Sequence, residues 1–201
     1  LSPKQQLIDE VYYADQMHLS LITNTKNVSL ERRSENWGSK DLSNWGSAAA
    51  NYGYATPGYM NSNHQYFSDK EYGLNLNPKI FSPNADGLND ILTINYAFPY
   101  PNMMANIDIY NRDGQLMTQI GNTISLGQKG NFIWEGICNG QYVPNGIYIL
   151  RFSLFDEKGL INNYKIPTNF FPLTTNYLQL KNKFFHYLDE LVYPLIFQFH
   201  L

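Results

Sequence analysis

The chain has 201 residues, of which 43% are hydrophobic and 15% are charged, with a formal net charge of -3 and a sequence pI near 5.8. This is enough apolar material for a buried core and too little charge for a disordered chain, and the length allows one or two domains of roughly 100 to 200 residues each. The charge balance argues against nucleic acids and anionic membranes as partners, because both require a basic surface.

Aromatic residues are abundant, with 16 Tyr and 12 Phe, which favours strands over helices. The single cysteine excludes an intrachain disulfide and a thiolate zinc site. No run of about 18 apolar residues is present, so we expect no transmembrane helix. The first residues lack the pattern of a signal peptide, and the chain therefore reads as a fragment of a longer protein.

The first third of the chain alternates short apolar runs with polar breaks. Residues 7–13, 19–22 and 28–30 are predicted to be short antiparallel strands, separated by polar residues such as those at 23–27. Residues 34–63 contain many Gly, Ser and Asn residues, which predicts a loop-rich region without a helix.

A polar connector over residues 64–77 is the predicted linker to a second unit. After it, residues 91–96 alternate with the period of a strand, and residues 106–110 and 115–120 flank an Asp-Gly hairpin turn. A further strand is predicted over residues 147–155. Turn signals at intervals of roughly 8 to 12 residues favour a β-sandwich over a sheet of βαβ units.

The sequence changes character near residue 165. Residues 170–171 and 184–185 are aromatic pairs, and Pro194 would end any helix before it. Two interpretations stay open for this tail: an amphipathic helix that forms on a partner, and an abnormal C-terminus without evolved structure. The helical spacing is carried by Tyr177, Leu180, Phe184, Leu188 and Leu191.

Four motifs in the second unit occur in the order of a known module. They are residues 81–90 (FSPNADGLND), 109–114 (IYNRDG), 134–136 (WEG) and 143–148 (VPNGIY). Together they resemble the FlgD-like, gliding-motility-associated C-terminal Ig-like domain. The resemblance implies an Ig-like β-sandwich over residues 78–165.

Motifs in the first unit resemble a different family. Residues 15–18 (DQMH), 26–32 (KNVSLER), 44–48 (NWGSA) and 55–62 (ATPGYMNS) are similar to the final strands of a bacterial lamin-tail domain. The first strands of that domain are missing from this sequence. The resemblance implies an incomplete Ig-like unit over residues 1–63.

The predicted fold class is therefore all-β, with two Ig-like β-sandwich units, the first incomplete, and a tail over residues 166–201. The resemblances imply a large secreted or outer-surface protein of the Bacteroidetes type whose end is read by the type IX secretion system. One departure stands out, because the module normally closes in a short basic strand, whereas residues 170–201 stay aromatic and apolar.

One loop has the composition of a cation site. Asn84, Asp86, Asn89 and Asp90 place side-chain oxygens around a glycine turn, as in loops that bind calcium. The loop lacks the closing bidentate Glu of an EF-hand, so structural Asx turns are the competing interpretation. Calcium is the only cofactor for which the sequence offers a candidate.

No residue pattern predicts catalysis. Glu135 has no partner carboxylate, and Trp134 beside a turn glycine is expected to be a core ring. Cys138 has no neighbouring cation that would activate its thiol. The histidines lack metal-ligand spacing; they are His18, His64, His186 and His200.

Two sets of residues are candidates for contacts rather than chemistry. Glu31 and Arg32 are adjacent opposite charges, which predicts that they pin a strand to the loop that follows it. Exposed tyrosines in the loops could stack on a glycan or a partner protein. These are Tyr54, Tyr59, Tyr66 and Tyr72.

The sequence thus predicts a non-catalytic, C-terminal structural, adhesion or secretion-associated region of an exported protein. Its expected partners are a protein or glycan at the cell surface and the secretion machinery. Two alternatives stay open: an accessory region of a secreted hydrolase or nuclease whose catalytic domain lies upstream, and an adhesin module stabilised by calcium.

Overall fold

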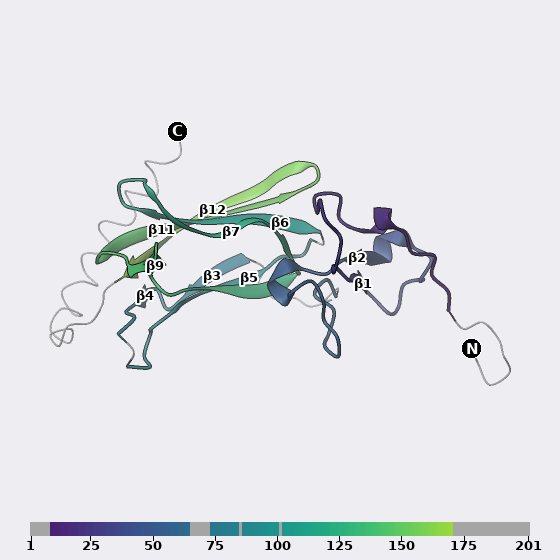
Figure 1. Cartoon of the computed structure of the whole chain (residues 1–201), viewed down its shortest axis with the longest axis horizontal. Helices are drawn as coiled ribbons and strands as arrows, with labels where there is room; N and C mark the ends of the chain where they lie inside the picture. The colour runs from purple at the N-terminus through teal and green to yellow at the C-terminus, as the bar shows by residue number, and fades with distance from the viewer. Residues whose placement is uncertain (1–8, 65–72, 85, 101, 171–201) are drawn as a thin grey trace.

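A computed structural model of the chain describes residues 9–64, 73–84, 86–100 and 102–170. Two sheets face each other, as the sequence predicted for an all-β Ig-like sandwich (Figure 1). One contains β4 (Ile80–Phe81), β6 (Met103–Asn111), β7 (Leu116–Leu126), β11 (Gly146–Asp156) and β12 (Gly159–Phe170), and the other contains β3 (Gly73–Asn77), β5 (Leu92–Ala97) and β8 (Lys129–Trp134).

The strand order is β4-β12-β11-β6-β7 in the five-stranded sheet and β3-β5-β8 in the three-stranded sheet. All neighbouring strands in both sheets are antiparallel except β4 and β12, which run parallel. In the described part of the chain, no helix is long and apolar enough to cross a membrane.

The core between the sheets follows from the alternation in β5. Leu92, Ile94 and Tyr96 point inward and are buried, whereas Thr93 and Asn95 are only partly buried, as the period of two requires. Burying a large apolar side chain contributes roughly 1.5–3 kcal/mol, so such rows supply most of the folding free energy. The other fully buried rings are Phe81, Phe152 and Phe170.

The hairpin between β6 and β7 forms where the sequence predicted it. Gly114 has a φ of +79°, its N–H donates to the Asn111 carbonyl at 3.0 Å, and the Asn111 side chain accepts from Asp113 N. A second hairpin joins β9 (Ile137–Cys138) to β10 (Gln141–Tyr142). These turns end the strands at one end of the sandwich.

Residues 9–64, the N-terminal segment, contain little regular structure. The 3-10 turns η1 (Asp15–Met17), η2 (Leu42–Asn44) and η3 (Ala50–Tyr52) alternate with β1 (Leu30–Arg32) and β2 (Trp45–Ser47), which pair antiparallel. The prediction that residues 34–63 are loop-rich and lack an α-helix is confirmed for this segment.

The strands predicted over residues 7–13 and 19–22 are wrong where the structure describes them. Residues 9–13 form no strand pairing and are followed by η1. Residues 20–21 form a turn. Val11, Tyr12 and Tyr13 are exposed. Leu19 is buried without a strand, because a side chain bonds to its backbone. It is 4% exposed, and its N–H donates to Ser47 Oγ at 2.9 Å.

The sandwich extends beyond its predicted limits at both ends. Strand β3 lies within the predicted linker 64–77 and pairs with β5, and β12 continues five residues past 165. Asn75 and Asn77 occupy the outward positions of β3, so its sequence looks like a polar connector. The division into two domains stays a prediction, and residues 171–201 of the predicted tail lie outside the described residues.

Candidate functional site

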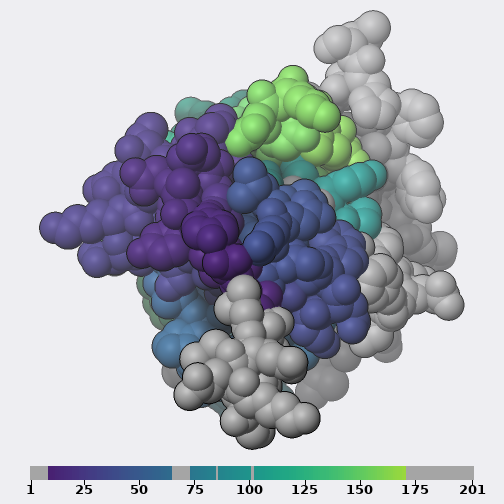
Figure 2. All heavy atoms as spheres, turned by 90° about the vertical axis from the view of Figure 1, so that its right-hand side faces the viewer, coloured from purple at the N-terminus to yellow at the C-terminus, as the bar shows by residue number. Residues whose placement is uncertain are grey.

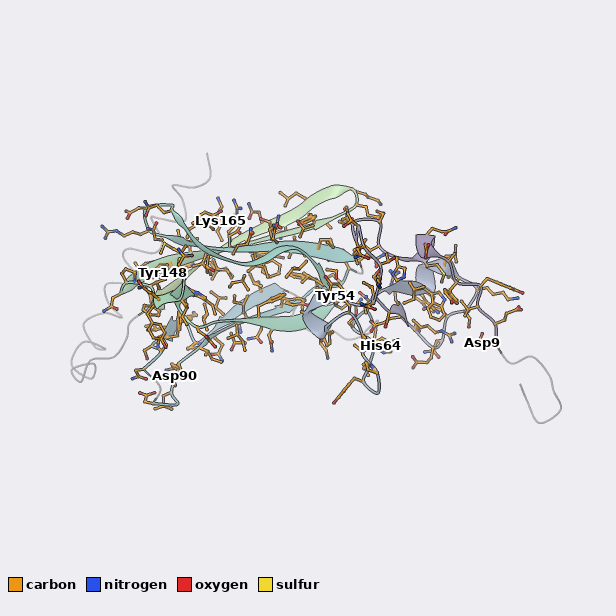
Figure 3. All side chains as sticks on the ribbon, viewed as in Figure 1. Asp9, Tyr54, His64, Asp90, Tyr148 and Lys165 are labelled. Carbon is orange, nitrogen blue, oxygen red and sulfur yellow. The ribbon has the colours of Figure 1, made fainter. Side chains whose placement is uncertain are left out.

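The loops that carry the four motifs meet at one end of the sandwich. At this end Leu92 of β5 pairs with Trp134 of β8, whereas Ala97 and Lys129 pair at the other end. We define the motif-bearing end as residues 82–91, 111–115 and 135–146. In Figure 3, Asp90 and Tyr148 lie toward this end, and Tyr54, His64 and Asp9 lie toward the other.

The WEG motif closes the core at the motif-bearing end. Trp134 is 4% exposed, and its ring centroid lies 5.3 Å from that of Phe81 and 5.5 Å from that of Tyr148, which confirms the predicted core role. Gly136 has a φ of +74°, and the Phe170 ring occupies the place of a Cβ. Glu135 is exposed.

The VPNGIY motif fixes the turn before β11. Tyr148 is buried, and its hydroxyl donates to the Pro144 carbonyl at 2.6 Å, while Val143 N donates to Gly136 O at 2.8 Å. Burial, with a smaller contribution from Cys138, raises the pKa of the Tyr148 phenol. The Cys138 thiol itself donates to the Met117 carbonyl at 2.6 Å.

The candidate calcium loop is held by its own side chains. Asp90 accepts from Asn84 N at 3.0 Å and from Gly87 N at 2.8 Å, one bond to each carboxylate oxygen. Asp86 accepts from Leu88 N at 2.7 Å and from the Asn84 side-chain amide at 2.9 Å. All four carboxylate oxygens therefore accept a bond within the loop, as in linked Asx turns.

The structure brings Asn84, Asp86 and Asp90 together through these bonds, whereas Asn89 contributes its main-chain carbonyl, which accepts from Ser82 N at 2.7 Å. Asn89 also adopts a positive φ of 58°, a conformation that Asn tolerates. Across the described ranges, no three His, Cys, Asp or Glu side chains group as metal ligands would. Calcium binding stays a prediction.

The opposite end of the sandwich is covered by the N-terminal segment. Ala50 N donates to Ser125 Oγ at 2.9 Å, the Tyr52 hydroxyl donates to Lys129 O at 3.0 Å, and Gln128 N donates to Ser62 O at 3.2 Å. Figure 2, viewed from this side, shows the purple and blue atoms of the segment in front of the sandwich.

Two glycines allow this close packing. A Cβ on Gly127 would stand 2.5 Å from the Ser62 carbonyl oxygen, and one on Gly130 would meet the Asn51 amide and, at 2.7 Å, the Tyr96 hydroxyl. Tyr96 is 3% exposed, and its burial raises the pKa of the phenol well above its ordinary value. The N-terminal segment therefore packs on the end of the sandwich opposite the motif-bearing end.

A buried carboxylate organises the N-terminal segment. Glu31 is 4% exposed and accepts from Thr56 Oγ1 at 2.5 Å, from Ser62 N at 2.8 Å and from Ser62 Oγ at 2.6 Å. Glu31 therefore pins β1 to residues 56–62, which is not the loop directly after the strand for which pinning was predicted.

Arg32 pins a different loop from Glu31. Its guanidinium donates to the Ser34 carbonyl at 3.1 Å, the Trp37 carbonyl at 2.5 Å and the Asp9 carboxylate at 3.1 Å. The adjacent charges thus reach opposite sides of β1, as consecutive residues of a strand do.

A second buried carboxylate, on the outer face of the five-stranded sheet, escaped the sequence reasoning. Asp108 is 2% exposed; its oxygens accept from Gln119 Nε2 at 2.8 Å and from Arg151 Nη2 at 2.7 Å. Arg151 also lies 5.2 Å from the centroid of the Tyr110 ring. A regular hairpin counted from the Tyr110–Leu116 pair would place Thr118 opposite Asp108. A register shift between Ile109 and Tyr110 places Gln119 there instead, so the hairpin prediction did not contain this pair.

The candidate contact tyrosines divide into two groups. Tyr59 is 83% exposed and Tyr54 is 36% exposed. Tyr66 and Tyr72 lie outside the described residues. His18 contacts Ser47 Oγ through Nδ1 at 2.9 Å, which is a packing role.

Comparison with known families gives one match. Residues 75–165 match the family model described as the CHU_C type IX secretion signal domain. No curated protein matches the chain. The matched residues coincide with the sandwich and include all four motifs of the second unit, so this part of the molecule is a secretion-associated region of an exported protein, secreted or attached to the cell surface.

Proposed function

We propose that the chain is a non-catalytic export module whose motif-bearing end is the surface that the type IX secretion machinery binds. The observation that carries this is the match of residues 75–165 to a secretion signal domain. The N-terminal segment covers the other end of the same sandwich, so the motif-bearing end is the one that this segment leaves uncovered.

Exposed apolar side chains on separate turns support this surface. Leu88 is 69% exposed in the loop before β5, Leu116 is 54% exposed after the β6–β7 turn, and Tyr142 is 61% exposed on β10. Tyrosine is enriched among the residues that supply most of the binding free energy at protein interfaces, and the two leucines add apolar area. Hydrogen bonds of Asp90, Asn111 and Tyr148 hold the neighbouring turns, so binding would cost little ordering entropy.

The non-catalytic assignment is supported by what the buried charges do. Glu31 and Asp108 each use their carboxylate oxygens to join separate strands or loops. Groups committed in this way serve the fold, since a general acid or base must reach a substrate proton.

The finer resemblances belong to this proposal as well. We assign the sandwich to the gliding-motility-associated type of signal domain in a Bacteroidetes protein, and residues 9–64 to the end of a lamin-tail domain. The Glu31 network supports the second assignment, because it joins two of the motifs that carry the resemblance, at residues 26–32 and 55–62.

The test is an export assay with the full 201-residue chain placed behind a periplasm-targeted fluorescent reporter, in a bacterium that has a type IX system. One variant combines Leu88→Glu, Leu116→Glu and Tyr142→Glu. The matched control carries three Glu substitutions at exposed sites away from that end, Leu42, Tyr59 and Leu160, which are 60%, 83% and 66% exposed. Both variants are first checked for a wild-type melting temperature.

We expect the wild-type fusion in the medium, the control released like wild type, and the motif-end variant retained in the periplasm. Retention of the wild-type fusion would contradict the export function. Equal release of the two variants would contradict the assignment of the surface while leaving the export function intact.

A further inference from the structure

The loop that follows η3, at residues 53–62, has no charged side chain and is strongly exposed at its tip. Residues 42–64 contain no Asp, Glu, Lys or Arg, and their polar side chains are hydroxyls, amides and one imidazole. Within this stretch, Tyr59 is 83% exposed and Met60 is 56% exposed. The loop projects from the body of the molecule below η3 in Figure 1.

The base of this loop is clamped to β1. Thr56 on one side and Ser62 on the other both donate to the buried Glu31 carboxylate, and the Asn61 amide donates to the Arg32 carbonyl at 2.7 Å. Such bonds to a buried charge are among the stronger ones in proteins. The two ends of the loop are therefore held together at a fixed position on the N-terminal segment.

The tip of the loop is a defined turn. Tyr59 N donates to the Thr56 carbonyl at 3.1 Å, and Gly58 adopts a φ of +77°, which a residue with a side chain rarely does. Tyr52, in contrast, is 38% exposed and bonded to Lys129 O, so its ring belongs to the contact with the sandwich. Tyr59 is thus held on a clamped turn and committed to no such contact.

We propose that this loop binds a neutral saccharide, with the Tyr59 ring as the platform on which a sugar ring stacks. The C–H groups on one face of a pyranose pack on an aromatic ring, and its hydroxyls bond to neutral donors and acceptors such as the Tyr54 and Tyr59 hydroxyls. Because the turn that carries Tyr59 is already formed, its backbone loses little conformational entropy on binding.

The charge and shape of the loop select this ligand class over others. A nucleic acid or an acidic polysaccharide would require Lys or Arg, and residues 41–69 contain neither. A protein partner of ordinary size covers about 800 Å² on each side, which calls for a broad face and not a projecting turn. A neutral sugar requires only a ring and a few hydrogen bonds.

The test measures retention of the full chain on beads of four neutral polysaccharides: β-1,4-glucan, xylan, mannan and chitin. We expect wild type to bind at least one of them, Tyr59→Ala to bind it roughly tenfold more weakly, and Tyr59→Phe to retain most of the affinity. Tyr13→Ala, which removes a ring of similar exposure (77%) elsewhere in the N-terminal segment, is the matched control and should bind like wild type.

Three results would overturn the proposal. One is no retention of wild type on any of the four polysaccharides. Another is retention that Tyr59→Ala leaves unchanged. The third is that Tyr59→Ala loses as much affinity for phenyl-substituted beads as for the polysaccharide beads, both measured against wild type. That result would identify the Tyr59 ring as a general apolar contact. The assay is independent of secretion, so its outcome and that of the export assay can be separated.

Discussion

The N-terminal segment and the sandwich are stabilised in different ways. In the sandwich, the described buried side chains are mainly aliphatic and aromatic, among them Phe81, Ile94 and Phe152. In the N-terminal segment, buried polar and charged side chains outnumber buried apolar ones, and Glu31 and Asn44 lie at its centre. The sandwich is stabilised mainly by apolar area removed from water. The segment is stabilised by hydrogen bonds to buried polar groups, although Nε and Nη2 of the buried Arg33 have no hydrogen-bond partner among the described residues.

This difference predicts how each region fails. An apolar core loses stability in proportion to the volume removed, and the loss spreads through the whole packed unit. A polar network loses stability when a single hydrogen-bonding atom is removed, because the buried group that bonded to it is left without a partner. The two regions should therefore respond differently to substitution, to acid and to calcium.

The largest effect is expected from Phe152→Ala in the sandwich. The Phe152 ring is fully buried, with its centroid 5.9 Å from that of Phe98 and 6.2 Å from that of Tyr96. Removing it should lower the free energy of unfolding by about 3–5 kcal/mol. Urea denaturation followed by tryptophan fluorescence measures this.

The control for that substitution is Tyr142→Ala, which removes a ring that is 61% exposed. It should stay within about 0.5 kcal/mol of wild type. Equal losses for Phe152→Ala and Tyr142→Ala would contradict a sandwich stabilised mainly by its core.

Glu31→Gln should have the next largest effect, and a local one. The substitution keeps the shape of the side chain but turns an acceptor into an amide donor facing Thr56 or Ser62, at a cost of about 1.5–3 kcal/mol. Hydrogen exchange should show faster exchange at β1 and residues 56–62 and little change in β11.

The exposed Glu35 provides the matched control, and Glu35→Gln should leave exchange unchanged. If Glu31→Gln speeds exchange equally in β11, the segment and the sandwich unfold together and the comparison between them fails.

A smaller effect is expected from Asp90→Ala in the loop at residues 82–90. The change removes the acceptor for Asn84 N and Gly87 N, which should cost about 1 kcal/mol in the presence of a chelator. Thermal unfolding in EDTA measures it.

Repeating those melts with millimolar calcium tests the predicted cation site. If the loop holds calcium, the melting temperature of wild type rises with the ion, and the Asp86→Ala, Asp90→Ala variant loses that rise, since a ligand stabilises only the state that binds it. If calcium does not change the melting temperature of wild type, the loop does not bind calcium and contains only structural Asx turns.

The smallest effect concerns acid, and it should appear in the N-terminal segment. A bond from Ser39 lowers the pKa of Asp9, Lys40 lowers the pKa of Glu10, and Ser43 lowers the pKa of Asp41. A carboxyl group with a lowered folded-state pKa stabilises the fold above its ordinary value and loses that contribution as the pH falls through the folded pKa.

The contribution of these groups should therefore begin to fall at the ordinary pKa values of 3.8 for aspartate and 4.5 for glutamate, and should be lost as the pH passes below their lowered folded-state pKa values. Limited proteolysis at pH 3 with an acid-active protease should cut residues 9–64 before the sandwich. The Asp9→Asn, Asp41→Asn variant should show a smaller difference between pH 3 and pH 6. Earlier cleavage of the sandwich would contradict this order.

The sequence by itself determined the features that depend on local periodicity and turn chemistry. The alternation of residues 92–96, the Asp-Gly turn at Gly114 and the core role of Trp134 all follow from neighbouring residues, and the structure has them. A period of two and a glycine with positive φ are properties of a short stretch of chain. The secretion-associated character of the second unit was also readable from its ordered motifs.

Only the tertiary structure decided the features that depend on distant partners. Strand β3 forms because it pairs with β5. Leu19 is buried without a strand because the Ser47 side chain bonds to its backbone, and Glu31 bonds to Thr56 and Ser62 of a distant loop. The gathering of the four motifs at one end, and the cover on the other, likewise follow from strand pairing. Such contacts join residues far apart in the sequence, so no local pattern encodes which partner each group will meet.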